Sequence, residues 1–315
     1  MGKIAFIFPG QGAQYPGMGK EIHEAFPVAR EVFDRASAVL GYDMAKVCFQ
    51  GTEEDLRQTE ITQPAILTVS YAMARVLLEK GVRPGALAGL SLGEYSALVL
   101  GGALSFDEAL GVVVRRGKIM QEEVPAGRGM MAAILGLENH LVETACQSAS
   151  SWGIVEPVNY NCPGQLVIAG EVEAVTKGME IAKSLGAKKT VALKVSAPFH
   201  TSLLAGAGEK LRGVLEQVVI KPLEIPVINN VAAQENRSPE DTFEKLVQQV
   251  YRPVLWEDSV NYLIEEGFDT FIEVGPSRSL SNFVKRISKE VTVLNVEDLK
   301  SLHKTIEALG GAHES

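Results

Sequence analysis

The sequence contains few cysteines and has no excess of basic charge. Its three cysteines are odd in number and lie far apart, at Cys48, Cys146 and Cys162. This spacing predicts neither a disulfide framework nor a metal-ligand cluster, and it is typical of a protein of the reducing cytosol. Acidic residues outnumber basic ones by 39 to 30, which gives a net charge of −9. A nucleic acid or an anionic membrane is therefore not expected as the main partner.

The sequence also lacks long apolar runs, internal repeats and low-complexity tracts. No stretch approaches the roughly 18 apolar residues that span a bilayer. Lys3 is followed directly by IAFIFPG, without the ordered regions of a secretory signal. We therefore expect a cytoplasmic protein without a membrane partner, and nothing in the sequence requires more than a monomer.

The composition is that of a globular protein, with 46% hydrophobic and 22% charged residues in a chain of 315. This length suggests about two domains. The segments KIAFIFPG and GVRPGALAGL have the pattern of buried strands, and helices are expected over about 94–100 and 106–123. Strands that alternate with helices predict a parallel sheet covered on both faces.

The middle of the sequence has a different order of elements. The pattern predicts a ferredoxin-like β-α-β-β-α-β arrangement over about 130–135, 138–151, 154–160, 166–169, 171–185 and 189–195. After SAPFH the larger pattern resumes, with a helix from about Ser202 and strands at IPVINN and TFIEVG. The expected fold is a large α/β-hydrolase-like domain with a parallel sheet, over residues 1–125 and 197–315. A small ferredoxin-like α+β domain, residues 126–196, is inserted into it.

Residues 89–93 read G-L-S-L-G, which matches the nucleophile elbow G-x-S-x-G. In that motif a serine occupies a strained turn between a strand and a helix, and a side chain at either flanking glycine would collide with the backbone. The expected strand before Ser91 and helix after it supply the required context. The alternative is a glycine-rich strand-to-helix loop without catalytic function.

A serine nucleophile needs a base, and His200 is the preferred candidate among the five histidines. It follows the last expected strand of the inserted domain, in VSAPFHT, at the junction of the two domains. The other four have the pattern of solvated or capping residues, namely His23, His140, His303 and His313. A buried structural histidine is the alternative interpretation of His200.

The third member of a hydrolase triad is not evident. Between Ser91 and His200 the only aspartate is Asp107, which lies at a helix start where capping explains it. The glutamates of this interval, including Glu143, Glu171 and Glu173, are assigned to polar helix faces. The sequence therefore predicts a Ser–His pair whose imidazole is oriented by something other than a carboxylate, and this argues against a standard esterase.

Arg116 lies on the apolar face of its expected helix, whereas its neighbour Arg115 lies on the polar face. An arginine directed into a core keeps its charge and needs an anionic partner. That partner is either an internal carboxylate or the carboxylate of a substrate, and the sequence favours neither.

The glycine-rich segment FPGQGAQYPGMGK follows the first expected strand. It lacks the glycines of a dinucleotide-binding fingerprint and the Ser or Thr of a phosphate-binding loop, so neither function is predicted. In a serine acyl enzyme this turn supplies the second oxyanion donor, and the residue after the nucleophile supplies the first. The expected donors are the backbone N–H groups of Gln11 and Leu92.

Five ordered motifs, FPGQGAQ, GLSLGEYSAL, RRGKIMQE, APFHT and QVYRPVLW, make the whole chain similar to a known family. It resembles malonyl-CoA:acyl carrier protein transacylases and the acyltransferase domains of polyketide and fatty acid synthases. The resemblance implies that Ser91 carries the acyl group, that His200 is its base and that Arg116 binds the malonyl carboxylate. It also implies oxyanion donors at Gln11 and Leu92. No cofactor or metal is implied.

The same resemblance implies roles for two further residues, and the sequence differs from many members of the family at one position. Gln249 matches a glutamine of the substrate-binding region near the histidine, where a main-chain carbonyl orients the imidazole. Phe199 matches the bulky residue that is typical of malonyl rather than methylmalonyl selection. Many members of the family have histidine before the nucleophile, whereas this sequence has Leu90.

The implied reaction moves a malonyl group from malonyl-CoA to the phosphopantetheine thiol of acyl carrier protein, through a malonyl-serine intermediate in fatty acid biosynthesis. Three alternatives stay open: a free-standing acyltransferase that loads a polyketide synthase, a serine acyl-thioester hydrolase, and a non-catalytic docking subunit. An acidic carrier protein would need a local basic patch. Two groups are candidates, one with Lys183, Lys188 and Lys189 and one with Arg278, Lys285 and Arg286.

Overall fold

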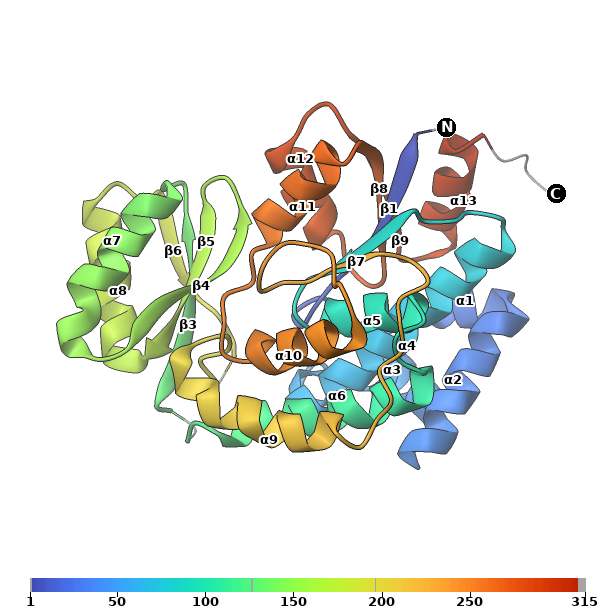
Figure 1. Cartoon of the computed structure of the whole chain (residues 1–315), viewed down its shortest axis with the longest axis horizontal. Coiled ribbons are helices and arrows are strands. Elements are labelled where there is room, and N and C mark those ends of the chain that lie inside the picture. Colours follow the sequence, from blue (N-terminus) through green and yellow to red (C-terminus); the bar gives the residue numbers. More distant parts are fainter. Residues whose placement is uncertain (1, 126, 196, 311–315) are drawn as a thin grey trace.

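The computed structural model describes residues 2–125, 127–195 and 197–310, and within these ranges its strands form two sheets (Figure 1). A parallel sheet has the strand order β7-β2-β1-β8-β9, and an antiparallel sheet has the order β4-β5-β3-β6. The architecture is thus mixed α/β with one parallel and one antiparallel sheet, as the sequence predicts at this level.

The parallel sheet is built on the first apolar run of the sequence. Its strands are β1 (Lys3–Phe8), β2 (Ala86–Gly89), β7 (Val227–Ile228), β8 (Phe268–Val274) and β9 (Thr292–Val296). The central strand β1 pairs with β2 through Ala5 and Ala86 and with β8 through Ala5 and Phe271. Because both faces of a parallel sheet are covered, its strands are apolar throughout rather than alternating.

Helices cover both faces of this sheet. Successive side chains of β1 point to opposite faces, and their contacts show which helices cover each face. Phe6 and Phe8 belong to a core shared with α2 (Pro27–Leu40), α4 (Thr59–Glu79), α5 (Leu92–Leu100) and α6 (Phe106–Glu122). Ala5 and Ile7 belong to a second core, shared with α11 (Trp256–Glu265) and α12 (Ser279–Ile287). Outside residues 127–195, the other α-helices of the described chain are α1 (Lys20–Ala25), α3 (Met44–Gln50), α9 (Ala205–Leu215), α10 (Pro239–Gln249) and α13 (Leu299–Ala308).

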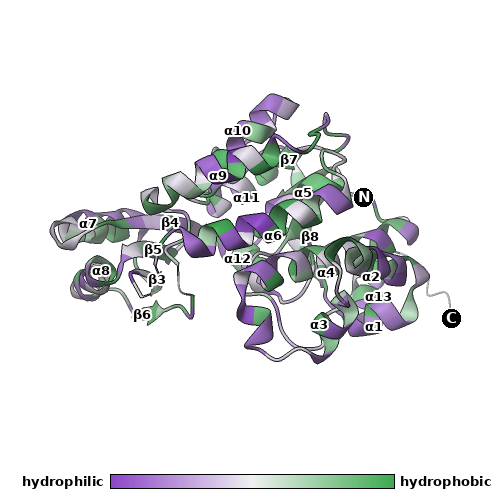
Figure 2. Ribbon diagram, turned by 90° about the horizontal axis from the view of Figure 1, so that it is seen from below, coloured by the Kyte–Doolittle hydropathy of each residue, from purple (hydrophilic) through white to green (hydrophobic). Residues whose placement is uncertain are grey.

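The antiparallel sheet follows the predicted order of elements. It comprises β3 (Gly129–Leu135), α7 (Asn139–Ala149), β4 (Val155–Cys162), β5 (Gln165–Glu171), α8 (Val172–Ser184) and β6 (Lys189–Ala192). Ala132 and Ile134 of β3 face a core with α7 and α8, whereas Met131 and Ala133 join the core of the large sheet. Figure 2 shows α7 and α8 at one end of the molecule and α1, α2 and α13 at the other. The inner face of the small sheet is therefore turned toward the large one.

Three expectations about these elements need correction. The strand at IPVINN pairs only through Val227 and Ile228, and β6 ends at Ala192 rather than Val195. We expected no apolar stretch long enough to span a membrane. This expectation was wrong, because the 21-residue helix α4 is long and apolar enough by length and composition. However, 78% of its apolar window is buried in the protein, as in a core helix. The expected domain limits at 126 and 196 lie outside the described residues.

Candidate active site

Ser91 lies between the end of β2 and the start of α5, in a strained backbone conformation. Its φ of 52° is rare for a residue with a side chain. A Cβ on Gly89 would overlap the backbone of Gly93, and a Cβ on Gly93 would overlap the carbonyl of Phe8. The two glycines are therefore required by the turn that raises the serine hydroxyl above the sheet.

His200 is hydrogen-bonded to Ser91 and to a main-chain carbonyl. Its Nε2 lies 2.8 Å from the Oγ of Ser91, and its Nδ1 lies 2.7 Å from the carbonyl oxygen of Gln249. A carbonyl only accepts, so Nδ1 carries the proton and Nε2 is left to accept from the serine hydroxyl. Burial, followed by the charge of Arg116, lowers the pKa of His200 to about 4. The imidazole is therefore neutral at pH 7, which is the state a general base requires.

Arg116 lies beside the same serine and is only 1% exposed. Its Nη2 donates to the Oγ of Ser91 at 3.0 Å and to Oε1 of Gln249 at 2.8 Å, and its Nη1 donates to Oε1 of Gln63 at 2.9 Å. The guanidinium also lies over the ring of Tyr95. Its acceptors among the described residues are all uncharged. The internal salt bridge considered from the sequence is not found there, and the charge of Arg116 faces the hydroxyl of Ser91.

Gln249 lies behind His200 and Arg116 and is fully buried. Its side-chain nitrogen donates to the carbonyl of Ser91 at 2.9 Å and to Oε2 of Glu94 at 2.7 Å. It is not among the residues that line the cavity around Ser91. Its side chain and its main-chain carbonyl together fix Arg116, His200 and the turn that carries Ser91.

Asn230, which follows β7, supports the turn from below. Its Oδ1 accepts the backbone N–H of Ser91 at 2.6 Å, and its Nδ2 donates to the carbonyl of Gly89 at 2.7 Å. Its own backbone N–H donates to Oε2 of Glu94 at 3.1 Å. These three bonds account for the strained φ of Ser91, because they hold both ends of the turn.

The first glycine-rich loop approaches this turn closely. A Cβ on Gly10 would overlap the carbonyl of Leu90, so a glycine is required where the loops meet. Gln11 follows and lines the cavity around Ser91. Within the described residues, the backbone N–H groups of Gln11 and Leu92 have no hydrogen-bond acceptor. Leu92 begins α5, so its N–H also lies at the positive end of the helix dipole.

The cavity around Ser91 has a volume of about 110 Å³. Leu90 and Phe199 form part of its apolar wall, together with side chains of the small sheet such as Met131 and Val167. Phe199 is 7% exposed and also lines the adjoining pocket of about 340 Å³. The residue before the nucleophile thus contributes an apolar surface.

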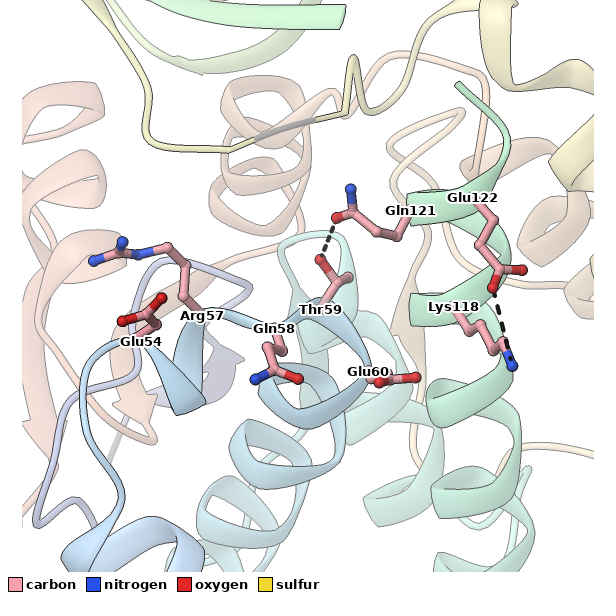
Figure 3. A pocket seen from close by; sticks show the side chains of 8 residues that line it. All are labelled: Glu54, Arg57, Gln58, Thr59, Glu60, Lys118, Gln121 and Glu122. Atoms are coloured by element: carbon pink, nitrogen blue, oxygen red, sulfur yellow. Dashed lines mark hydrogen bonds and ion pairs between the residues drawn. The ribbon is translucent and has the colours of Figure 1, made fainter. Parts of the chain in front are cut away.

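Two further pockets lie in succession beside this cavity. The adjoining pocket shares Gln11, Val195 and Phe199 with the cavity, and it shares Arg57, Thr59 and Gln121 with an outer pocket of about 440 Å³. Figure 3 shows the outer pocket, where Thr59 Oγ1 donates to Gln121 Oε1 at 3.0 Å and Lys118 lies near Glu122. Among the described residues, the basic side chains that line the two outer pockets are Arg57, Lys118 and Lys194.

The structure thus brings together Ser91, His200, Arg116 and Gln249, with the loop of Gln11 and the start of α5 alongside. His23 and His140 lie elsewhere: His23 packs against Phe33, and His140 lies near Glu138. His313 is outside the described residues.

Two sequence expectations about acidic residues were wrong. Asp107 does not cap α6, because Ser105 and Glu108 form the capping box and Asp107 pairs with Arg35 at 2.6 Å. Glu94 lies between Ser91 and His200 in the sequence, yet it is fully buried rather than on a polar face. Asn230 and Gln63 were also missed, and no local pattern distinguishes either of them.

The comparison with known proteins agrees with this geometry. Residues 5–311 match the family of the acyl transferase domain, and the chain therefore belongs to the acyl transferase family. Malonyl CoA-acyl carrier protein transacylase of Bacillus subtilis is 45% identical over 310 residues, covering 98% of this chain and 98% of that protein.

Solved structures are similar along almost the whole chain. Malonyl CoA-acyl carrier protein transacylase from Clostridium perfringens has 48% identity and a TM-score of 0.94, covering 98% of this chain and 97% of that one. A second structure is a type II PKS acyl-carrier protein in complex with its malonyl-transacylase. It has 44% identity and a TM-score of 0.95, covering 97% of this chain and 99% of that one.

Proposed function

We propose that the protein transfers a malonyl group from malonyl-CoA to the phosphopantetheine thiol of acyl carrier protein, through a malonyl ester on Ser91. The observation that carries this proposal is the position of Arg116, a buried cation 3.0 Å from the Oγ of Ser91 whose acceptors in the described parts of the chain are all uncharged. A carboxylate-bearing acyl group supplies the missing anion. The names of the relatives, which are malonyl transacylases, support the same reaction.

The first half-reaction begins when Nε2 of His200 takes the proton of Ser91 as Oγ attacks the thioester carbonyl. The N–H groups of Gln11 and Leu92 stabilise the resulting oxyanion, and losing one such donor typically costs about 3 kcal/mol. The tetrahedral intermediate then collapses, the CoA thiolate leaves and takes the proton from His200. The serine ester remains, with the malonyl carboxylate bound by Arg116.

The second half-reaction runs the same chemistry in reverse with a different thiol. His200 removes the proton of the phosphopantetheine thiol, the thiolate attacks the ester, and Ser91 recovers its proton. The kinetics are therefore ping-pong. Thioester exchange is nearly isoenergetic, so we propose that no cofactor or metal takes part.

We propose that the pantetheine arm enters through the two outer pockets, since they share lining residues in succession with the cavity of Ser91. In this proposal Phe199 limits the space beside the acyl group and selects malonyl over methylmalonyl. Gln249 acts by orienting His200 and Arg116, because its side chain does not line the cavity.

Both candidate patches for the acidic carrier protein hold exposed cations without an ion pair among the described residues, and Lys183, Lys188 and Lys189 supply those of the small sheet and its neighbouring helix. Arg278 pairs with Glu297 at 2.6 Å, and Arg286 donates to the carbonyl of Pro163 at 2.6 Å. Lys285 is exposed and has no ion-pair partner among the described residues. Charge reversal at Lys285 should raise the KM for carrier protein and spare malonyl-enzyme formation. An effect only on reversing Lys183, Lys188 and Lys189 would assign docking to the small sheet.

We propose the finer description of the fold on the same basis. The elbow at the end of β2 supports a hydrolase-like large domain, and the strand order β4-β5-β3-β6 supports a ferredoxin-like inserted domain. We propose a monomer, because Ser91, His200 and Arg116 contact one another within a single chain and complete the site without a second copy. The three buried, unpaired cysteines support a cytoplasmic location, and fatty acid biosynthesis is the proposed pathway.

Loading of a polyketide synthase is a second candidate, because one similar structure holds a type II PKS acyl-carrier protein. Incubation of the protein with malonyl-CoA and holo carrier proteins of both pathways tests the proposal. Malonyl transfer to the fatty acid carrier is expected, and preference for the polyketide carrier would favour the second candidate. Release of free malonate without transfer would instead indicate a hydrolase.

A further inference from the structure

Glu94 is a fully buried carboxylate three residues after Ser91. Its Oε2 accepts from the side-chain nitrogen of Gln249 at 2.7 Å and from the backbone N–H of Asn230 at 3.1 Å. Its Oε1 has no hydrogen-bond partner among the described residues. The reaction derived above does not use this side chain.

The amide of Gln249 connects Glu94 to Arg116. Its nitrogen donates to Glu94, and its oxygen accepts from Nη2 of Arg116 at 2.8 Å. A buried cation, one neutral amide and a buried carboxylate therefore form a continuous chain. The chain ends at the hydroxyl of Ser91, to which Arg116 also donates.

The charges around Glu94 favour a role as the counter-charge of Arg116. Buried ions are stabilised by partners of opposite charge, and the direct acceptors of Arg116 supply none. The ionisable groups that act on Glu94 are Arg116 from α6, Lys245 from α10 and Tyr95 from α5 itself. The helix α4 also packs against α5. Its ionisable side chains lie at exposed or half-buried positions, namely Glu60, Tyr71, Arg75 and Glu79. The strands β2 and β7 carry no ionisable side chain, and β1 carries only the exposed Lys3 at its start.

We propose that Glu94 is a positioning and specificity-determining residue, which acts through Gln249 to weaken the hold of Arg116 on the carboxylate of the acyl group. The inference rests on the proposed function, since it requires a carboxylate-bearing acyl group on Ser91. A bare buried arginine would bind that group tightly and retain it. With Glu94 as an anion on the other side, the same arginine binds the malonyl group yet releases it to the second thiol.

The protonation of Glu94 sets when this effect operates. Burial raises the pKa of Glu94 to about 7, against the hydrogen bonds from Gln249 and Asn230 and the charge of Arg116, which lower it. Glu94 is therefore mostly neutral at pH 6 and mostly an anion at pH 8. Replacing it with the uncharged glutamine should matter at pH 8 and have little effect at pH 6.

The test measures the malonyl-CoA concentration that half-saturates acylation of the enzyme, by rapid quench and mass spectrometry. For Glu94→Gln this concentration should be about three- to tenfold below the wild-type value at pH 8 and equal to it at pH 6. The matched control is Glu273→Gln, because Glu273 is also fully buried and accepts two backbone N–H groups, from Leu280 and Ser281. The control should follow the wild type at both pH values.

A purely structural role for Glu94 predicts the same change at both pH values, and that result would overturn the proposal, as would no change at pH 8. If Glu94→Gln fails to fold, the wild type is titrated with malonyl-pantetheine, which carries no phosphate. Its half-saturating concentration should rise by a similar factor from pH 6 to pH 8, and a flat profile would overturn the proposal. A wild-type protein that forms no adduct would instead refute the proposed function.

Discussion

The main-chain carbonyl of Gln249 lies 2.7 Å from Nδ1 of His200, where a serine hydrolase triad has a carboxylate. A carbonyl orients the ring and fixes its tautomer as a carboxylate does, but it adds no full negative charge to stabilise the imidazolium. Arg116, on the other side of Ser91, disfavours the imidazolium further. The pair is thus built around a weakly basic histidine, which suits a reaction between thioesters and an ester.

This geometry predicts the pH dependence of acylation. Because the pKa of His200 is lowered to about 4, the ring stays neutral above that value. At saturating malonyl-CoA the acylation rate should be level from pH 8 to pH 5 and fall toward pH 4. His200→Ala should lose about 10²- to 10⁴-fold in rate. Rapid-quench measurements check both, and an acid limb near the ordinary histidine pKa of 6.5 would contradict this account.

The role of Arg116 is tested against its neighbour in the sequence. Arg116→Ala should lower acylation by malonyl-CoA about 10- to 150-fold, because charged hydrogen bonds contribute about 1.5–3 kcal/mol, and should affect acetyl-CoA far less. Arg115 lies on the same helix and donates instead to Gln217. Arg115→Ala should therefore leave both rates unchanged. Equal losses with malonyl-CoA and acetyl-CoA would show that Arg116 does not bind the carboxylate.

Gly93, two residues after the nucleophile, lies so close to the backbone of Phe8 that a side chain at this position should lower the stability of the protein. Gly93→Ala should reduce the free energy of unfolding by about 1–3 kcal/mol, because the new Cβ overlaps the carbonyl of Phe8. Gly111, in the middle of α6, faces open space, so Gly111→Ala should add about 0.5–1 kcal/mol. Urea unfolding compares the two. Equal stabilities for both variants would mean that the elbow relaxes without cost.

Glu273 predicts a pH dependence of stability. Burial raises its pKa to about 7 from the model-peptide value of 4.5. The folded state then binds more protons than the unfolded state between these values, so this group lowers stability as the pH rises from about 4.5 to 7. As the pH rises through this range, wild type should therefore lose stability relative to Glu273→Gln. The free energy of unfolding of the variant should gain up to about 3 kcal/mol over that of wild type. Urea unfolding at pH 5 and pH 8 measures it, and a constant difference would be the contrary result.

The sequence predicts the parts of the site that depend on local pattern. The glycines at 89 and 93 between an apolar run and a helix predict the elbow, and the apolar face of α6 predicts the burial of Arg116. The role of His200 is predicted because this residue follows the last expected strand of the inserted domain, at the junction of the two domains. These residues are recognisable because each is defined by neighbours within about one turn or strand.

The supporting residues could not be predicted in this way. Glu94 lies in a segment whose pattern fits a buried helix, but its partners come from α10 and from the end of β7. Asn230 belongs to an apolar run, IPVINN, in which only two residues pair with β2. Which residues of such a run enter the sheet depends on packing between distant segments, and no periodicity encodes that.

The most direct test of the central claim is the intact mass of the protein after brief mixing with malonyl-CoA in the absence of carrier protein. Wild type should gain the mass of one malonyl group, and Ser91→Ala should gain none. Digestion of the adduct should place the group on Ser91. Release of CoA by a wild-type protein that stays unmodified would contradict the claim that a malonyl ester accumulates on Ser91. An adduct that still forms in Ser91→Ala would contradict it as well.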